Sequence, residues 1–199
     1  MGRMAIEKER KDNPQKKMEW AKILFPHFQQ YGLRNVTMDE VAKVLQKSKA
    51  TVYKYFKTKD EIVEFVVQYK LGEIAGFVPV LTDESRPFVQ RYIKAVEHIS
   101  TQLLEISNLF LSDLRKFYSE IWDMVNQFRD MAVNQLKDYY ESGIKQGIFN
   151  NINPKLLALS DQVLFDTLTD PQTLDKYGFT LKSVFEEYFK MRLYGVLKR

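Results

Sequence analysis

Residues 37–56 read TMDEVAKVLQKSKATVYKYF, and two helix start signals divide this stretch. Thr37 is followed three residues later by Glu40, so the threonine hydroxyl can cap a helix while the glutamate reaches back to the backbone, as in a capping box. Ser48 is a second capping residue and directly precedes another helical run. The sequence therefore predicts two short helices joined by a tight turn. Their expected bounds are residues 38–45 and 49–56.

The second expected helix has two different faces. At helical spacing, Val52 and Phe56 fall together on one side, whereas Ala50, Thr51 and Lys54 fall on the opposite side. The second helix of a helix-turn-helix needs this arrangement, because one face anchors to the core while a polar face enters the major groove of DNA. The small side chains allow a close approach, with a methyl group available to a thymine.

Two more side chains of this helix suit DNA. Tyr53 lies at the edge of the polar face, where its hydroxyl can donate to a phosphate, and Lys49 lies in the first turn, nearest the base edges. The alternative is that the apolar residues are core and the lysines a solvated face. We accept the core role for Val52 and Phe56. For the polar residues, the distribution of charge along the chain helps to decide between a solvated face and a DNA-binding face.

The net charge of +4 is unevenly distributed along the chain. Residues 1–60 hold fourteen Lys or Arg and seven Asp or Glu, whereas the remainder holds sixteen and nineteen. Such a bias predicts a polyanionic partner at the N-terminal end, either nucleic acid or an anionic membrane surface. A membrane-surface helix is long and leaves its apolar face free, whereas these helices are short and need theirs to pack together. DNA is therefore the favoured partner.

The stretch from Ala21 to Val67 resembles the DNA-binding domain of the TetR family. The matching residues are Ala21, Leu24, Phe25, Gly32, Thr37, Val41, Ala42, residues 48–56 and residues 59–62. The resemblance implies a regulator that contacts DNA through Thr37, Lys49, Thr51, Tyr53, Lys54 and Lys59. Of these, Lys59 is expected to reach the DNA backbone from a helix start, and base reading is expected from Lys49, Ala50, Thr51 and Lys54.

The turn between the two helices departs from the family pattern. The family usually has glycine and then a small apolar residue here, whereas this chain has Gln46 and Lys47. If residue 46 adopts a positive φ, glutamine costs about 1 kcal/mol relative to glycine and can shift the recognition helix slightly. Lys47 offers an additional phosphate contact, so it joins the predicted DNA-binding residues.

Glycine and proline are sparse, and apolar residues recur at three- and four-residue spacing, which predicts an all-α protein. A first helix is expected from Pro14 to Tyr31, either bent at Pro26 or broken there into two pieces. We expect an N-terminal helix-turn-helix domain over residues 1–60, a connector helix over 59–78 and a C-terminal helical domain over 79–199.

The C-terminal domain is expected to begin with a loop at residues 79–86. Helical stripes follow at residues 89–103 and 121–139, the second closed by Gly143 and Gly147. Two helices are then expected to finish the chain, at about residues 154–170 and 180–197.

The resemblance implies that this domain binds a ligand and forms a homodimer through the last two helices. The first of these spreads its apolar residues over more than one stripe, which a monomer could not wholly cover; Leu156, Leu157, Leu159 and Val163 are examples. A dimer also suits the paired half-sites that helix-turn-helix proteins read. The alternative is a thick monomeric core.

Large aromatic residues concentrate in the middle helices and suit a pocket for a small apolar or aromatic effector. The candidate ligand-pocket residues are His98 and Asn108 as polar anchors, with Phe110, Phe117, Tyr118, Trp122 and Phe128. The alternative is that these aromatics are plain core. If an effector binds, we expect it to change the spacing of the two recognition helices through the long helix from Lys59, and so to release a repressed operator.

Other classes of protein are disfavoured. The sequence has no cysteine, no glycine-rich phosphate loop and no serine in a nucleophile turn, so we expect no enzyme, no catalytic residue and no cofactor. His27 and His98 are far apart in sequence, so no metal site is expected. With no apolar run long enough for a membrane span or a secretory signal, we expect a cytoplasmic protein without a membrane partner. A non-specific DNA-coating protein, with nearly equal affinity for all sequences, remains the alternative function.

Overall fold

The computed structural model describes residues 13–168 and 170–198, and confirms the all-α prediction for them, with one isolated β-bridge between Phe149 and Leu197. Residues 1–12 of the predicted N-terminal domain and residue 169 of the predicted 154–170 helix lie outside the described residues. The helices are α1 (Pro14–Tyr31), α2 (Met38–Val44), α3 (Lys49–Val52), α4 (Lys59–Ala75), α5 (Phe77–Thr82), α6 (Phe88–Leu103), α7 (Asn108–Phe117), α8 (Ser119–Lys145), α9 (Pro154–Leu168), α10 (Pro171–Tyr177) and α11 (Leu181–Val196).

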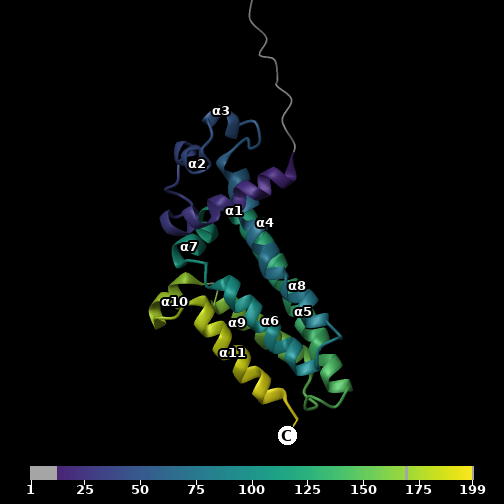
Figure 1. Cartoon of the computed structure of the whole chain (residues 1–199). Helices are drawn as coiled ribbons and strands as arrows, with labels where there is room; N and C mark the ends of the chain where they lie inside the picture. Colours follow the sequence, from purple (N-terminus) through teal and green to yellow (C-terminus); the bar gives the residue numbers. More distant parts are fainter. Residues whose placement is uncertain (1–12, 169, 199) are drawn as a thin grey trace, which may run out of the picture.

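The helices form two halves joined by long helices (Figure 1). α1, α2 and α3 gather at one end of the molecule, and α4 leads away from them in contact with α1 and α8. In the other half, α6 packs on α5 and α11, and α8 packs on α9. Among the described residues, no helix combines the length and the hydropathy needed to cross a bilayer.

Two large apolar cores hold these halves together. The first joins α1–α4 to Phe110 and Leu114 of α7 and Ile121 of α8. The second joins the end of α4 to α5, α6, α8, α9 and α11, with Tyr92 and Tyr140 among its most buried side chains. Because α7 and α8 complete the first core, the N-terminal helices are packed onto the rest of the chain rather than tethered to it.

The first helix is continuous through its proline. Asn13 caps α1 by accepting a hydrogen bond from the Lys16 amide at 2.9 Å, and Pro14 occupies the first turn. α1 then runs past Pro26 to Tyr31 as one element, so the prediction of two separate pieces is wrong. Trp20, Leu24 and Phe28 are buried on one face, and this packing holds the helix together where the proline removes a backbone donor.

The loop expected at residues 79–86 is partly helical. The connector helix ends at Ala75, before residue 78, and α5 then covers Phe77–Thr82. Pro79 lies in the first turn of α5, where a missing amide donor costs nothing because that amide has no partner within the helix. The loop itself is confined to residues 83–87.

Three further expectations need correction. α7 and α10 were not predicted as separate helices, although Ser107 and Asp170 cap them, so three helices rather than two finish the chain. Gly143 does not close the preceding helix, because α8 continues to Lys145. Gly143 instead allows close packing, since a Cβ there would clash with the Phe149 ring. Gly147, with φ +70°, lies just beyond the helix end.

Candidate nucleic-acid interface and apolar cavity

The predicted capping box is present at the start of α2. The Thr37 amide donates to Glu40 Oε2 at 2.7 Å, its hydroxyl donates to the same oxygen at 2.9 Å, and the Glu40 amide donates back to Thr37 Oγ1 at 3.3 Å. The amide and the hydroxyl of Thr37 lower the pKa of the Glu40 carboxyl by donating to its ionised form. The Thr37 side chain is exposed but occupied by this cap.

The turn that follows α2 ends the helix with glutamine in the left-handed region. Gln46 has φ +54° and is the only described residue other than glycine with a positive φ. The Gln46 amide donates to the Lys43 carbonyl at 3.0 Å, and the Lys47 amide donates to the Ala42 carbonyl at 2.9 Å. These two bonds are a Schellman motif, in which glycine is the preferred residue at the position that Gln46 occupies.

Gln46→Gly is therefore expected to stabilise the protein by about 1 kcal/mol, because glycine has no Cβ to strain a left-handed backbone. The measurement is urea unfolding followed by circular dichroism. Gln46→Ala is the matched control, because alanine keeps the Cβ and should bring no gain. Equal stability of the glycine and alanine variants would contradict the strain argument.

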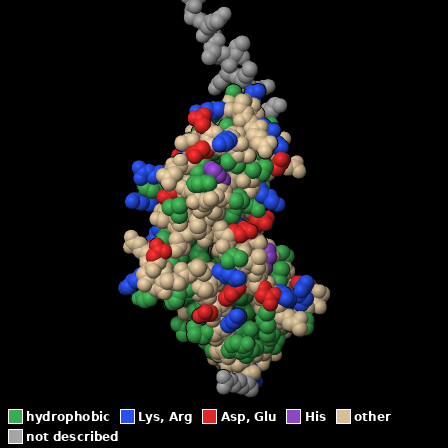
Figure 2. Space-filling view, turned by 60° about the vertical axis from the view of Figure 1, so that its left-hand side comes forward, with side chains coloured by type: hydrophobic (Ala, Val, Ile, Leu, Met, Phe, Trp, Pro, Cys, Tyr) green, Lys and Arg blue, Asp and Glu red, His purple; other side chains and the backbone are tan. Residues whose placement is uncertain are grey.

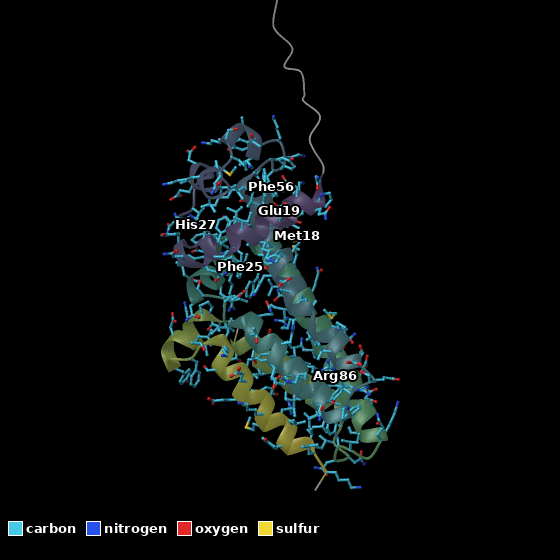
Figure 3. The ribbon with its side chains drawn as sticks, viewed as in Figure 1. Met18, Glu19, Phe25, His27, Phe56 and Arg86 are labelled. Atoms are coloured by element: carbon cyan, nitrogen blue, oxygen red, sulfur yellow. The ribbon has the colours of Figure 1, made fainter. Side chains whose placement is uncertain are left out.

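The inner face of α3 fixes its position against α1. Val52 and Phe56 are fully buried, and the Tyr55 ring lies against Trp20 with centroids 4.7 Å apart. The Lys17 ammonium lies over the Phe56 ring at 5.6 Å, and Figure 3 shows Phe56 beside this part of α1. α3 is shorter than expected, since it ends at Val52 and turns continue the chain to Tyr55.

The outer face of α3 and of the turns that follow it is polar and open to solvent. Ala50 and Lys54 are exposed, and Tyr53 is 43% exposed although it is aromatic. Thr51 is half-buried, with its hydroxyl 2.8 Å from that of Ser48. Lys49 is exposed and paired with Asp39 of α2 at 3.0 Å, a solvent-exposed ion pair that a phosphate or base can replace at little cost.

Two more of the predicted DNA contacts, Lys47 and Lys59, lie on either side of this segment. Lys47 is exposed in the turn before α3. Lys59 is the first residue of α4, and its ammonium donates to the Arg34 carbonyl at 3.0 Å. Burial lowers the pKa of Lys59 from its usual value, against the opposing effect of nearby carboxylates. In this structure the Lys59 side chain therefore holds the backbone at Arg34, in the loop before α2.

Residues 27–66 match a family model described as bacterial regulatory proteins, tetR family. This span includes α2, the turn at Gln46, α3 and the start of α4, which is the geometry just described. Residues 27–66 therefore form a TetR-family DNA-binding region. TetR-family regulators bind DNA through a helix-turn-helix, so this chain is a DNA-binding transcriptional regulator.

Similarity to transcriptional regulators extends over most of the chain. The uncharacterized HTH-type transcriptional regulator YhgD of Bacillus subtilis (strain 168) is 28% identical over 170 residues, covering 81% of this chain and 87% of that protein. A transcriptional regulator from Saccharomonospora viridis in complex with choline superposes with a TM-score of 0.71 at 16% identity, covering 94% of this chain and 100% of that one. FadR from Bacillus subtilis in complex with stearoyl-CoA superposes with a TM-score of 0.66 at 16% identity, covering 89% of this chain and 98% of that one. At these identities the two structures show a shared fold.

The C-terminal half contains a partly open apolar cavity of about 150 Å³ between α4, α6, α7, α8 and α11. Its lining surface is entirely apolar, and Phe110 and Phe128 of the predicted pocket residues contribute to it. The other five predicted residues lie elsewhere. Asn108 donates to Asp175 at 2.6 Å, His98 Nε2 lies 2.8 Å from the Glu73 carbonyl oxygen, and Phe117 stacks under the Arg34 guanidinium. Tyr118 and Trp122 pack against the first core.

α7 connects this cavity to the helix-turn-helix. Phe110 and Leu114 line the cavity, whereas Asp113 points to the loop before α2. The buried Asp113 carboxylate accepts a hydrogen bond from the Arg34 amide at 3.0 Å. A Cβ at Gly32 would lie 2.7 Å from the same carboxylate oxygen, and Gly32 has φ +81°, so glycine is needed there. Sequence reasoning missed Asp113, whose signal is a lone carboxylate between apolar residues of α7.

Proposed function

We propose that this protein is a ligand-responsive repressor that binds a palindromic operator as a homodimer. The observation that carries the proposal is the outer face of α3, which is polar and exposed while its inner face is anchored in the core. The DNA-binding residues in this proposal are Thr37, Lys47, Lys49, Ala50, Thr51, Tyr53, Lys54 and Lys59. Phosphate contacts from the lysines supply affinity, and the small residues of α3 approach the bases.

The dimer in this proposal forms through α9 and α11. Both helices expose apolar side chains at three- and four-residue spacing, and each of these side chains is more than half exposed: Leu156, Leu159, Val163, Met191 and Tyr194. Figure 2, which turns this side of the molecule forward, shows hydrophobic side chains gathered toward the end that carries the C-terminal helices. A second copy of the chain is the expected occupant, because TetR-family regulators form dimers and a two-fold interface pairs a patch with itself.

The ligand in this proposal occupies the apolar cavity. Two structural neighbours were solved with small molecules, choline in one and stearoyl-CoA in the other. In this chain, a ligand that displaces Phe110 or Leu114 moves α7, and α7 holds the loop before α2 through Asp113. Operator affinity then falls only as far as the ligand prefers the non-binding arrangement.

The experiment that tests the proposal is selection of bound sequences from a random duplex pool at near-physiological salt. A palindromic motif is the expected result, with a preference of at least about 10³ over background DNA. Binding without any recovered motif would favour a non-specific DNA-coating protein, whose affinity falls steeply with salt on every sequence.

Lys54→Ala is expected to weaken operator binding about 10- to 100-fold, because each protomer of the dimer loses one contact from the outer face of α3. Fluorescence anisotropy with the selected operator measures the change. Lys145→Ala, at the exposed end of α8, removes the same charge away from α3 and is the control. Equal affinities of the two variants would place the recognition surface elsewhere.

A further inference from the structure

A second hollow of about 200 Å³ lies between α6 and α11. Tyr92, Val96 and Ser100 line it from α6, and Phe189 and Leu193 line it from α11. Unlike the apolar cavity, this groove has polar surface, and Glu97, Glu186 and Lys190 contribute to its lining. None of the residues that the sequence predicts as DNA or ligand contacts lies here.

The groove and the apolar cavity share a wall. Tyr92, Val96 and Phe189 line both spaces. A ligand that reaches from one space to the other would have to rotate the Tyr92 or Phe189 side chain, and would then join a cavity with apolar lining surface to a groove that carries polar groups. The joined shape has an apolar end toward α7 and a polar end between α6 and α11.

A buried hydroxyl at this wall has no hydrogen-bond partner. Ser100 and Tyr92 are each 1% exposed; Ser100 Oγ makes no hydrogen bond, whereas the Tyr92 hydroxyl lies beside that of Tyr140. Buried polar groups in folded proteins are almost always paired, because leaving one unpaired costs free energy. Burial raises the pKa of Tyr92 well above the usual phenol value, against the opposing effect of the Tyr140 hydroxyl, so the Tyr92 hydroxyl stays protonated.

The charges at the apolar cavity are already neutralised. Lys70 is buried and donates to Glu105 at 2.6 Å and to Gln102 at 3.0 Å. Arg129 forms an ion pair with Asp166. An anionic ligand would have to displace one of these carboxylates, whereas a neutral ligand leaves both pairs intact.

We propose that the effector is a neutral amphiphile, whose apolar body fills the cavity and whose hydroxyl or carbonyl group binds Ser100 and Tyr92 at the α6–α11 groove. This inference rests on the proposed function in taking the apolar cavity as the effector site. Ser100 and Tyr92 then determine specificity for the polar group, and the cavity walls select the apolar body.

The test is isothermal titration calorimetry of the full-length protein with three probes: 1-octanol, sodium octanoate and toluene. We expect 1-octanol to bind at least tenfold more tightly than octanoate. Ser100→Ala and Tyr92→Phe are each expected to weaken 1-octanol binding about tenfold, the usual effect of one lost hydrogen bond to a buried group. Toluene, which has no polar group, should bind both variants within about twofold of the wild type.

Ser112→Ala and Tyr177→Phe are the matched controls, because both residues are exposed and lie outside the groove. Without a probe, Ser100→Ala should melt at or above the wild-type temperature, since it loses a hydroxyl that has no partner. A lower melting temperature of Ser100→Ala, tighter binding of octanoate, or unchanged 1-octanol binding in both groove variants would each overturn the inference. If toluene binds while any of these results is obtained, the apolar cavity remains the proposed effector site and only the inference about the polar group fails. If none of the three probes binds, both the inference and the proposed effector site fail. Operator selection tests DNA binding independently.

Discussion

Val163→Asp is expected to convert the dimer into monomers and to lower operator affinity by at least about 100-fold. Val163 is 58% exposed on α9, in the middle of the apolar stripe of α9 and α11. In a two-fold interface the substitution buries a carboxylate from each protomer in the same apolar contact. A monomer reads one half-site alone and loses the contribution of the second.

Sedimentation velocity measures the oligomeric state, and anisotropy measures operator affinity. Leu104→Asp is the matched control, because Leu104 is 63% exposed beyond the C-terminal end of α6 and lies outside the stripe. Circular dichroism should show the same helix content for both variants. A Val163→Asp protein that remains dimeric would rule out the α9–α11 face as the interface.

Local signals in the sequence were sufficient for the helix-turn-helix. The capping residues Thr37 and Ser48, and the buried positions Val52 and Phe56, act within a few residues of one another, so a short stretch predicts the structure that forms. The positive φ anticipated for Gln46 is present as well, because the turn demands it whichever residue occupies the position.

The cavity could not be predicted in the same way, because it depends on which face of each helix meets which neighbour. Phe110 and Phe117 lie two turns apart on the same side of α7, yet Phe110 lines the cavity whereas Phe117 is 43% exposed and lies under Arg34. Helical periodicity places both on one stripe but does not say that the neighbours of this stripe change along α7. Asp113 was missed for the same reason, since its partner is a backbone amide 79 residues away in the chain.

The short helices illustrate a second limit. α10 has all its local signals, with Asp170 as the cap, Pro171 in the first turn and Gly178 at φ +65° after the end. Its seven residues carry too few apolar positions to show a period, so the helix is not visible as a stripe. The caps alone mark it, and the packing of buried Leu174 against α7 makes it stable.

A buried polar cluster holds α8, α9 and α11 together beneath the proposed dimer face. Asp161 of α9 is fully buried, accepts hydrogen bonds from Tyr140 at 3.0 Å and Tyr188 at 2.7 Å, and forms an ion pair with Arg192 at 2.6 Å. Burial raises the pKa of both tyrosines above the usual phenol value, so both stay protonated and donate.

Asp161→Ala is therefore expected to lower the free energy of unfolding by about 3 to 5 kcal/mol, because it leaves the Arg192 charge partly buried without its partner. Urea unfolding at a fixed protein concentration measures this, since dimerisation makes stability concentration-dependent. The double variant Asp161→Leu with Arg192→Met removes both charges and should recover most of the loss, because apolar side chains of similar size often replace a buried pair without penalty.

The two variants separate two roles of the cluster. If the ion pair contributes only to stability, the double variant should dimerise and bind the operator like the wild type. If it also sets the angle between α9 and α11, the double variant should fold but dimerise less tightly, because the two helices present the stripe jointly. A single Asp161→Ala variant as stable as the wild type would show that Arg192 finds another partner or reaches solvent when the carboxylate is lost.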